Sequence, residues 1–166
     1  LDIFEHVQRK RLNMGLILVG AEHHAPAYQS QIRRAIKKKE LDGHVLFTGQ
    51  VNDAAVLATL LRQASFLMVT SDWETFCVPV AEAMFFGTPP IVHGIPPLPE
   101  IAGKGGVVVD KKQVKKTAVS ILDLLEDKSR YHQLSQAAEI RANQFTDSAL
   151  VDALQSLLVQ LFGDSI

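Results

Sequence analysis

Two glutamates, Glu74 and Glu82, stand eight residues apart on either side of the expected start of a helix. We expect this helix over residues 80–86, because Pro79 has the backbone angle of a first helical position and Gly87 ends the helix. Glu74 would then lie in the preceding loop and Glu82 in the first turn. A helix N-terminus offers free N–H groups and a partial positive charge to phosphate, and carboxylates accept hydrogen bonds from vicinal hydroxyls. The spacing predicts a pocket for a phosphorylated sugar.

Short apolar runs alternate with amphipathic helical patterns, and this order predicts parallel strands joined by crossover helices. The expected fold class is α/β, with a three-layer, doubly wound and mostly parallel sheet. Ligands bind beyond the carboxyl ends of such strands, where residues 71–79 form the connection richest in polar side chains. Strands are expected at residues 15–20, 44–48, 65–70, 90–93 and 106–109, and helices from residue 1, at 28–41, 52–63 and 80–86, and between 112 and 162.

Composition and charge exclude several classes of protein. The length of 166 residues suits one domain, and the 47% apolar and 21% charged residues are typical of a folded chain. A net charge of -1 provides no field for a general nucleic-acid-binding surface. The apolar runs fall far short of the ~18 residues of a membrane span. The single cysteine, Cys77, cannot form an internal disulfide and favours a reducing compartment, so we expect a cytoplasmic location.

Several other features have plainer structural explanations. His23 and His24 lack the further ligands of a metal shell, so we expect surface histidines and no metal. Cys77 would lie at a helix N-terminus, where a thiolate is stabilised, but without a positioned base we expect packing rather than catalysis.

The basic run at residues 33–39 is expected to be a solvated helix face, with docking on a membrane surface as the alternative. Apolar stripes of the C-terminal helices are expected to face the core, with a partner helix as the alternative; they contain Ile121, Leu122, Leu125, Leu150, Leu154, Leu157, Leu158 and Leu161.

Residues 71–89, with the sequence SDWETFCVPVAEAMFFGTP, closely resemble the E-x7-E motif of retaining GT-B glycosyltransferases, the group 1 or family 4 transferases. The segments LPEIAG at 98–103 and GVVVD at 106–110 look like the part of the family that follows this motif. The segments LILVG at 16–20 and VLFTG at 45–49 match its strand-and-glycine pattern. The resemblance covers almost the whole chain, and the order of the flanking motifs makes it far more specific than E-x7-E alone.

The resemblance implies a role for each matching position. Glu82 would accept hydrogen bonds from the ribose hydroxyls of a nucleotide diphosphate sugar, and Glu74 would be the catalytic carboxylate that holds hydroxyls of the donor hexose. No cofactor and no metal are expected. The other donor-binding positions form two groups. Thr75, Phe76, Cys77 and Val78 would lie at the sugar and diphosphate, and Gly20, Gly49, Gln50 and Val51 would lie at the nucleobase.

Two departures from the family pattern bear on the donor. Thr75 and Cys77 stand where the family usually has glycine, so the backbone donors remain while the side chains narrow the sugar pocket. The Arg and Lys that bind phosphate in the family lie on a loop before its first helix, upstream of Leu1. We therefore expect a first strand and an N-terminal acceptor-binding domain upstream, with residues 1–166 as a single Rossmann-like nucleotide-sugar-binding domain.

The activity implied by the resemblance is transfer of a hexose from a nucleotide diphosphate sugar, such as a UDP- or GDP-hexose, to a hydroxyl acceptor with retention. The expected partners are this donor and the N-terminal acceptor-binding domain of the same polypeptide, without nucleic acid. The full enzyme is open to peripheral membrane association, and the isolated domain is expected to be inactive. Two alternatives share the architecture: a UDP-sugar epimerase of GT-B-like fold and a non-catalytic nucleotide-binding module. The ordered motifs favour the transferase.

Overall fold

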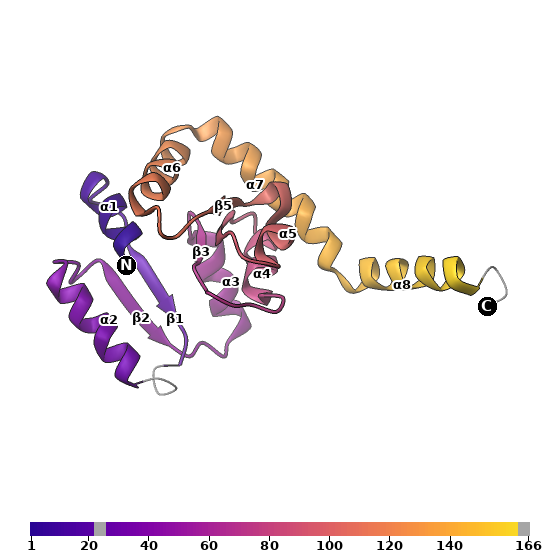
Figure 1. Ribbon diagram of the computed structural model, residues 1–166, viewed down its shortest axis with the longest axis horizontal. Coiled ribbons are helices and arrows are strands. Elements are labelled where there is room, and N and C mark those ends of the chain that lie inside the picture. The colour runs from indigo at the N-terminus through magenta and orange to yellow at the C-terminus, as the bar shows by residue number, and fades with distance from the viewer. Residues whose placement is uncertain (22–25, 163–166) are drawn as a thin grey trace. The chain divides into compact units, whose positions relative to one another are not determined.

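Short strands alternate with helices along the chain (Figure 1), and the strands of each sheet run parallel. The computed structural model describes residues 1–21 and 26–162. The chain packs as two compact units: unit 1 comprises Leu1–Leu60 and Asp110–Lys128, and unit 2 comprises Leu61–Val109 and Ser129–Ile166. The predicted α/β class with parallel strands is confirmed. That residues 1–166 act as one domain stays a prediction.

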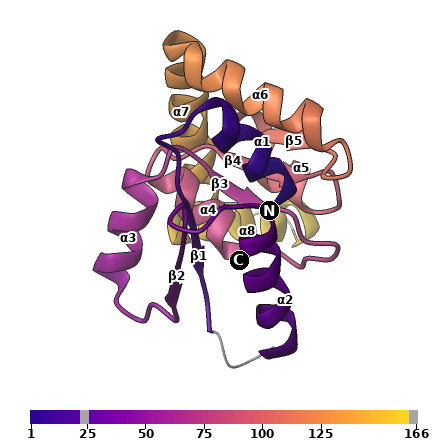
Figure 2. The same ribbon diagram turned by 90° about the vertical axis from the view of Figure 1, so that its left-hand side faces the viewer.

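Unit 1 is built on a two-stranded parallel sheet, whose strands lie side by side (Figure 2). Leu16 pairs with Val45, and a shift of register later brings Val19 opposite Gly49. Side chains alternate between the two faces of a strand, and one face packs against buried residues of the neighbouring helices, with Leu41 only 1% exposed. The elements are α1 (Asp2–Lys10), β1 (Leu16–Val19), α2 (Pro26–Lys38), β2 (Val45–Gly49), the first part of α3 (Ala54–Gln63) and α6 (Val114–Glu126).

Charged groups tie the first helix of unit 1 to the end of the second. The Lys39 ammonium lies 2.6 Å from a carboxylate oxygen of Glu5 and 2.6 Å from one of Asp2. The hydrogen bonds raise the pKa of Lys39 and lower the pKa values of Asp2 and Glu5. Arg33 stacks on Phe47, with its guanidinium 4.2 Å from the ring centroid. The basic face of α2 therefore makes specific contacts in addition to its contact with water.

Unit 2 contains a three-stranded parallel sheet in the order β3-β4-β5. Its core joins apolar side chains of the sheet to those of three helices, with Val80, Met84 and Leu98 fully buried. The elements of unit 2 are the end of α3, β3 (Leu67–Val69), α4 (Val78–Phe85), β4 (Pro90–His93), α5 (Leu98–Ala102), the short 3-10 helix Gly103–Gly105, β5 (Val107–Val109), α7 (Lys128–Ala142), the short 3-10 helix Asn143–Phe145 and α8 (Asp147–Phe162).

The helix α7 approaches the rest of unit 2 closely because small residues line the contact. A Cβ atom at Gly105 would lie 2.4 Å from Cα of Ala138, a separation that packed atoms do not tolerate. At Gly87, where φ is +69°, a Cβ atom would lie 3.1 Å from Oγ of Ser135. This hydroxyl donates a hydrogen bond of 2.6 Å to the Gly87 carbonyl. Glycine at both positions thus sets how near α7 can come.

Most elements lie close to where the sequence predicts them, and the strand at 90–93 matches fully. The sequence predicts Asn52 or Asp53 as the cap of α3, and the structure assigns this role to Asp53, because its Oδ1 accepts hydrogen bonds from the amides of Ala55 at 2.8 Å and Val56 at 3.3 Å. The helix predicted over 28–41 ends earlier, at Lys38, because Glu40 adopts a left-handed backbone with φ 57°.

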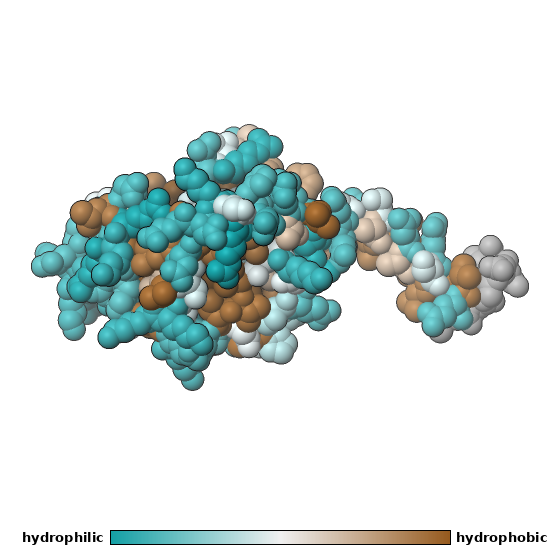
Figure 3. Space-filling model, turned by 90° about the horizontal axis from the view of Figure 1, so that it is seen from above, coloured by the Kyte–Doolittle hydropathy of each residue, from teal (hydrophilic) through white to brown (hydrophobic). Residues whose placement is uncertain are grey.

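The last helix, α8 (Figure 1), leaves its described large apolar side chains exposed (Figure 3). Leu150, Leu154 and Leu157 are 69%, 53% and 49% exposed, so the prediction that this stripe faces a core is wrong for these residues. The side chains of Leu158 and Leu161, which belong to the same predicted stripe, lie outside those that the structure describes. The stripe in α6 is different, because Ile121 is buried there as predicted. Among the described residues, no helix combines the length and apolar character that a membrane span requires.

Gly105→Ala is expected to lower the free energy of unfolding by about 2 to 3 kcal/mol, because the new methyl group meets helix backbone that cannot move aside. Urea unfolding of the full-length protein, followed by circular dichroism, measures the change. Gly15→Ala is the matched control, since a Cβ atom there meets only the His44 carbonyl at 3.7 Å. We expect a change below about 1 kcal/mol for the control. Equal losses in both variants would contradict the close approach of α7.

Candidate functional site

The loop between β3 and α4 in unit 2 contains the predicted carboxylate pair and its helix N-terminus. Cys77 is the N-cap of α4 and has a left-handed backbone, with φ 60° and ψ 66°. The helix begins at Val78, two residues earlier than predicted, because Pro79 occupies a first-turn position for which its ring is suited. Glu82 consequently lies beyond the first turn, so the prediction of a first-turn carboxylate is wrong.

Three backbone N–H groups at the start of α4 are available to a ligand. The amides of Phe76, Cys77 and Val78 make no hydrogen bond to any part of the chain that the structure describes. Unpaired donors at a helix N-terminus, together with the positive end of the helix dipole, favour a bound anion. The side chains of Phe76 and Val78 are 42% and 56% exposed, so this end of the helix is open to solvent.

Glu74 is held in place within its loop. The Ser71 hydroxyl donates a hydrogen bond of 2.6 Å to Oε1 of Glu74. The half-buried Glu82 carboxylate, one turn into α4, makes no hydrogen bond or ion pair with the described residues. One carboxylate is therefore oriented by its surroundings, whereas the other keeps its acceptor capacity for a ligand.

The Cys77 thiol is a poor nucleophile in this position. Burial raises its pKa, and the neighbouring Glu74 carboxylate raises it further by repelling a thiolate and by accepting a hydrogen bond from the neutral thiol. These two effects outweigh the stabilisation of a thiolate by the helix N-terminus, so the pKa of Cys77 is raised overall. Because only a thiolate reacts readily, the thiol is a poor nucleophile. The geometry agrees with a packing role for Cys77, whose side chain contacts the core of unit 2.

The predicted nucleobase loop belongs to unit 1. The Gly20 amide donates a hydrogen bond of 3.0 Å to the Gly49 carbonyl, which joins the carboxyl ends of β1 and β2. Gly49 has φ +68°, and a Cβ atom at either glycine would meet nothing within 4 Å. Gln50 is exposed and its Nε2 donates to Asn52 at 2.8 Å, while Val51 is half-buried. These residues belong to unit 1, whereas Glu74 and Cys77 belong to unit 2.

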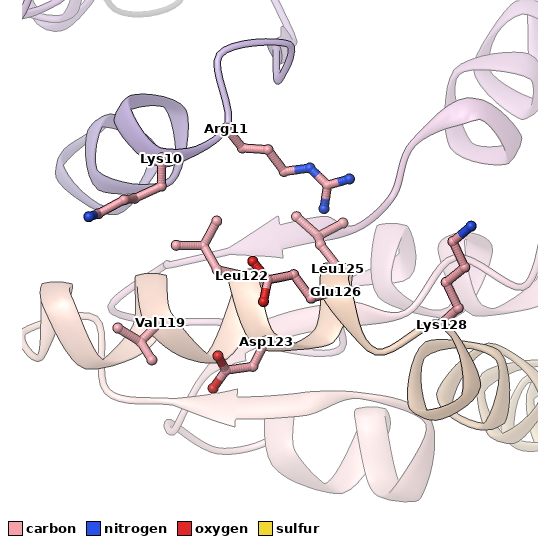
Figure 4. A pocket seen from close by; sticks show the side chains of 8 residues that line it. All are labelled: Lys10, Arg11, Val119, Leu122, Asp123, Leu125, Glu126 and Lys128. Carbon is pink, nitrogen blue, oxygen red and sulfur yellow. The ribbon is translucent and has the colours of Figure 1, made fainter.

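An open groove of about 630 Å³ lies in unit 1 at some distance in the sequence from all of these residues (Figure 4). Lys10 and Arg11 come from the end of α1, and Leu122, Leu125 and Glu126 come from α6. Its charges are of both signs over an apolar floor, and it contains none of the predicted site residues. We therefore place the candidate site at the start of α4 rather than in this groove.

Phe145 is a residue near the site that the sequence did not reveal. Its ring lies 5.4 Å from the ring of Phe76 with the planes at 79°, an edge-to-face contact. No local sequence pattern links two residues so far apart in the chain.

Among the residues that the structure describes, no group of three or more metal-ligating side chains is found. His23 and His24 lie outside the described residues.

The family model of the glycosyl transferases group 1 matches residues 1–141, most of the chain. The chain belongs to this family. The predicted resemblance to group 1 glycosyltransferases is thereby confirmed. In these terms, the loop from β3 into α4 is the segment that carries the E-x7-E motif.

Two curated relatives of this group 1 chain are mannosyltransferases by name. It is 29% identical over 111 residues to O-antigen chain mannosyltransferase B of Escherichia coli, covering 67% of this chain and 29% of that protein. It is 30% identical over 105 residues to GDP-mannose:cellobiosyl-diphosphopolyprenol alpha-mannosyltransferase of Xanthomonas oryzae, covering 62% of this chain and 27% of that protein. The chain thus spans less than a third of the length of these relatives.

Solved structures share the fold of this group 1 chain. The C-terminal domain of the group 1 protein LpcC from Francisella tularensis has a TM-score of 0.71 at 20% identity, over 86% of this chain and 77% of that one. Anabaena HepE, solved in complex with UDP-glucose, has a TM-score of 0.81 at 19% identity, over 97% of this chain and 44% of that one. At these identities the likeness establishes the Rossmann-like GT-B fold.

Cys77→Gly is expected to change the free energy of unfolding by less than about 1 kcal/mol. Glycine removes the strain of a side chain at a left-handed backbone, and this gain offsets the lost packing and the greater entropy of the unfolded chain. Cys77→Val is expected to cost about 2 kcal/mol, since a β-branched side chain is strained at φ 60°. Urea unfolding of both variants measures the difference. A valine variant as stable as the glycine variant would contradict the left-handed turn at Cys77.

Proposed function

We propose that this chain is the donor-binding part of a retaining hexosyltransferase and that the nucleotide diphosphate sugar binds where β3 leads into α4. The observation that carries the proposal is the set of three unpaired amides at the start of α4, flanked in sequence by Glu74 and Glu82, in a chain of the group 1 family. Amides with a helix dipole suit the diphosphate, and carboxylates suit sugar hydroxyls.

The role of these groups in transfer is electrostatic. As the acceptor oxygen bonds to the anomeric carbon and the bond to the diphosphate breaks, negative charge grows on the leaving phosphate. The amides of Phe76, Cys77 and Val78 stabilise that charge because they are already oriented and need not first give up a protein partner. The departing diphosphate takes the acceptor proton on the same face of the sugar, which retains configuration. Glu74 positions the hexose, and Glu82 holds the ribose.

GDP-mannose is the donor that the comparisons favour. Both reported relatives are named as mannosyltransferases, and the Xanthomonas oryzae name specifies GDP-mannose and an alpha-mannosyl product. Because the mannose of GDP-mannose is itself alpha-linked, an alpha product corresponds to retention. HepE was solved with UDP-glucose, but its 19% identity supports the fold rather than the sugar. We give the sequence relatives more weight for the donor.

The remaining partners follow the family plan. We propose an acceptor-binding domain in the same polypeptide, with the hydroxyl acceptor bound there, and no metal or other cofactor in the transfer. The Gly20 and Gly49 group lines the nucleobase, since its glycines leave open space for a flat ring. A cytoplasmic location stays a prediction from the single cysteine, which is free.

Calorimetric titration of the full-length protein with GDP-mannose, UDP-glucose and ADP-glucose tests the donor. We expect GDP-mannose to bind at least about tenfold more tightly than the other two, which corresponds to about 1.4 kcal/mol. Tighter binding of UDP-glucose would overturn the choice of donor while leaving the transferase in place. Binding of none of the three would overturn the donor site, and conversion of a bound UDP-sugar without acceptor would indicate an epimerase.

Glu82→Gln is expected to raise the KM for the donor by about 10- to 100-fold, because the amide group accepts ribose hydrogen bonds less well than a carboxylate. Glu74→Gln is expected mainly to lower kcat, by a similar factor. Steady-state transfer assays with a radiolabelled donor separate the two constants. Glu126→Gln, an exposed carboxylate on α6, is the control and should keep both constants. Wild-type kinetics in both site variants would show the assignment to be wrong.

A further inference from the structure

Arg141 lies near the end of α7 and binds the carboxyl end of α5. Its Nε donates a hydrogen bond of 3.1 Å to the Ile101 carbonyl, and its Nη2 donates one of 2.6 Å to the Glu100 carbonyl. These are carbonyls that a helix as short as α5 leaves without partners of its own. Gly103 makes room for the guanidinium, because a Cβ atom there would lie 3.0 Å from Nε. Arg141 thus fastens α7 to α5.

The same guanidinium continues the contact toward residues 70–77, the loop between β3 and α4 that we call the donor loop. It lies over the ring of Phe145, 4.9 Å from the centroid, and its Nη1 donates to the side chain of Gln144. Phe145 in turn makes the edge-to-face contact with Phe76. Phe145 and Cys77 also pack against the same core cluster of unit 2. A continuous line of contacts therefore runs from α5 through Arg141 and Phe145 to the donor loop.

Two hydrogen bonds lie within the donor loop or at its junction with α4. Within it, Ser71 bonds to Glu74, and the Cys77 carbonyl accepts from the Val80 amide at 2.9 Å. Trp73 is 78% exposed, and the amides of residues 76–78 make no hydrogen bond to the described residues. A segment with unpaired amides and exposed aromatic residues is held weakly by itself. The ring of Phe145 holds Phe76 from outside the loop through their edge-to-face contact.

We propose that Arg141 and Phe145 are positioning residues for the donor loop. They hold Phe76, and with it the amides of residues 76–78, in the arrangement that receives the diphosphate. Preset donors bind an anion more tightly than donors that must first become ordered. The link to the diphosphate rests on the proposed function, whereas the link to the order of the loop rests on the contacts alone.

Hydrogen exchange of the ligand-free, full-length protein tests the tether, with mass spectrometry resolving the peptide that covers residues 71–80, in which the hydrogen-bonded Val80 amide reports on the turn at Cys77. Arg141→Lys keeps the positive charge but removes the planar guanidinium that donates to two carbonyls, and Phe145→Leu keeps an apolar group but removes the ring. Both are expected to speed exchange in this peptide by about 3- to 10-fold. Phe145→Tyr keeps the ring and should exchange as the wild type does.

Arg62→Lys is the matched control for the loss of a stacked guanidinium. Arg62 lies over the ring of Phe86, 4.7 Å from the centroid, and has no part in the line of contacts to Phe76. It should leave exchange at residues 71–80 unchanged. Unchanged exchange in both test variants, or equally faster exchange throughout unit 2, would overturn the tether. A local increase confined to the loop would support it.

Donor binding provides the second measurement, with GDP-mannose and UDP-glucose as the probes. Arg141→Lys and Phe145→Leu are expected to raise the KM for the donor by about 3- to 10-fold with kcat at saturation unchanged, because the bound donor itself then orders the loop. Faster exchange with a wild-type KM would overturn the role in donor binding. Binding of neither probe by the wild type would overturn the proposed function, and hydrogen exchange would still decide the tether.

Discussion

The left-handed backbone at Cys77 determines where α4 starts, and the candidate site depends on that turn. A residue with φ 60° turns the incoming loop so that Val78 enters the helix with its amide N–H unpaired, and Pro79 follows with no N–H group. The amides of residues 76–78 are left without partners in the described part of the chain. The same turn therefore begins the helix and leaves the unpaired amides on which the proposed donor site depends. Glycine usually occupies such a position because it has no Cβ atom to be strained.

The close approach of α7 connects this turn to the rest of unit 2. Gly105 allows the backbone of α7 to lie against the short 3-10 helix that follows α5, at a distance which any larger residue would prevent. That approach brings Arg141 to the carbonyls at the end of α5 and places Phe145 against Phe76. The packing of α7 therefore also positions the loop, because Arg141 on α7 and Phe145 just after it make the contacts that reach Phe76.

The electrostatics of the loop are consistent with transfer chemistry that needs no protein nucleophile. Glu74 keeps the neighbouring Cys77 as a thiol, and burial acts in the same direction. Ser71 orients the Glu74 carboxylate toward a defined position. A carboxylate held in this way can accept hydrogen bonds from hydroxyl groups, while the unpaired amides beside it can donate to a diphosphate. The division of roles between the groups follows from their charge.

The sequence by itself determined the α/β class, a helix cap at Asn52 or Asp53 and the strand at 90–93, because cap residues and apolar runs act on their neighbours in the chain. It also revealed the family through the ordered motifs around Glu74 and Glu82. Only the tertiary structure decided that Phe145 contacts Phe76 and that Leu150, Leu154 and Leu157 stay exposed. These outcomes depend on which distant surfaces meet, and periodicity shows that a helix has an apolar face without showing what covers it.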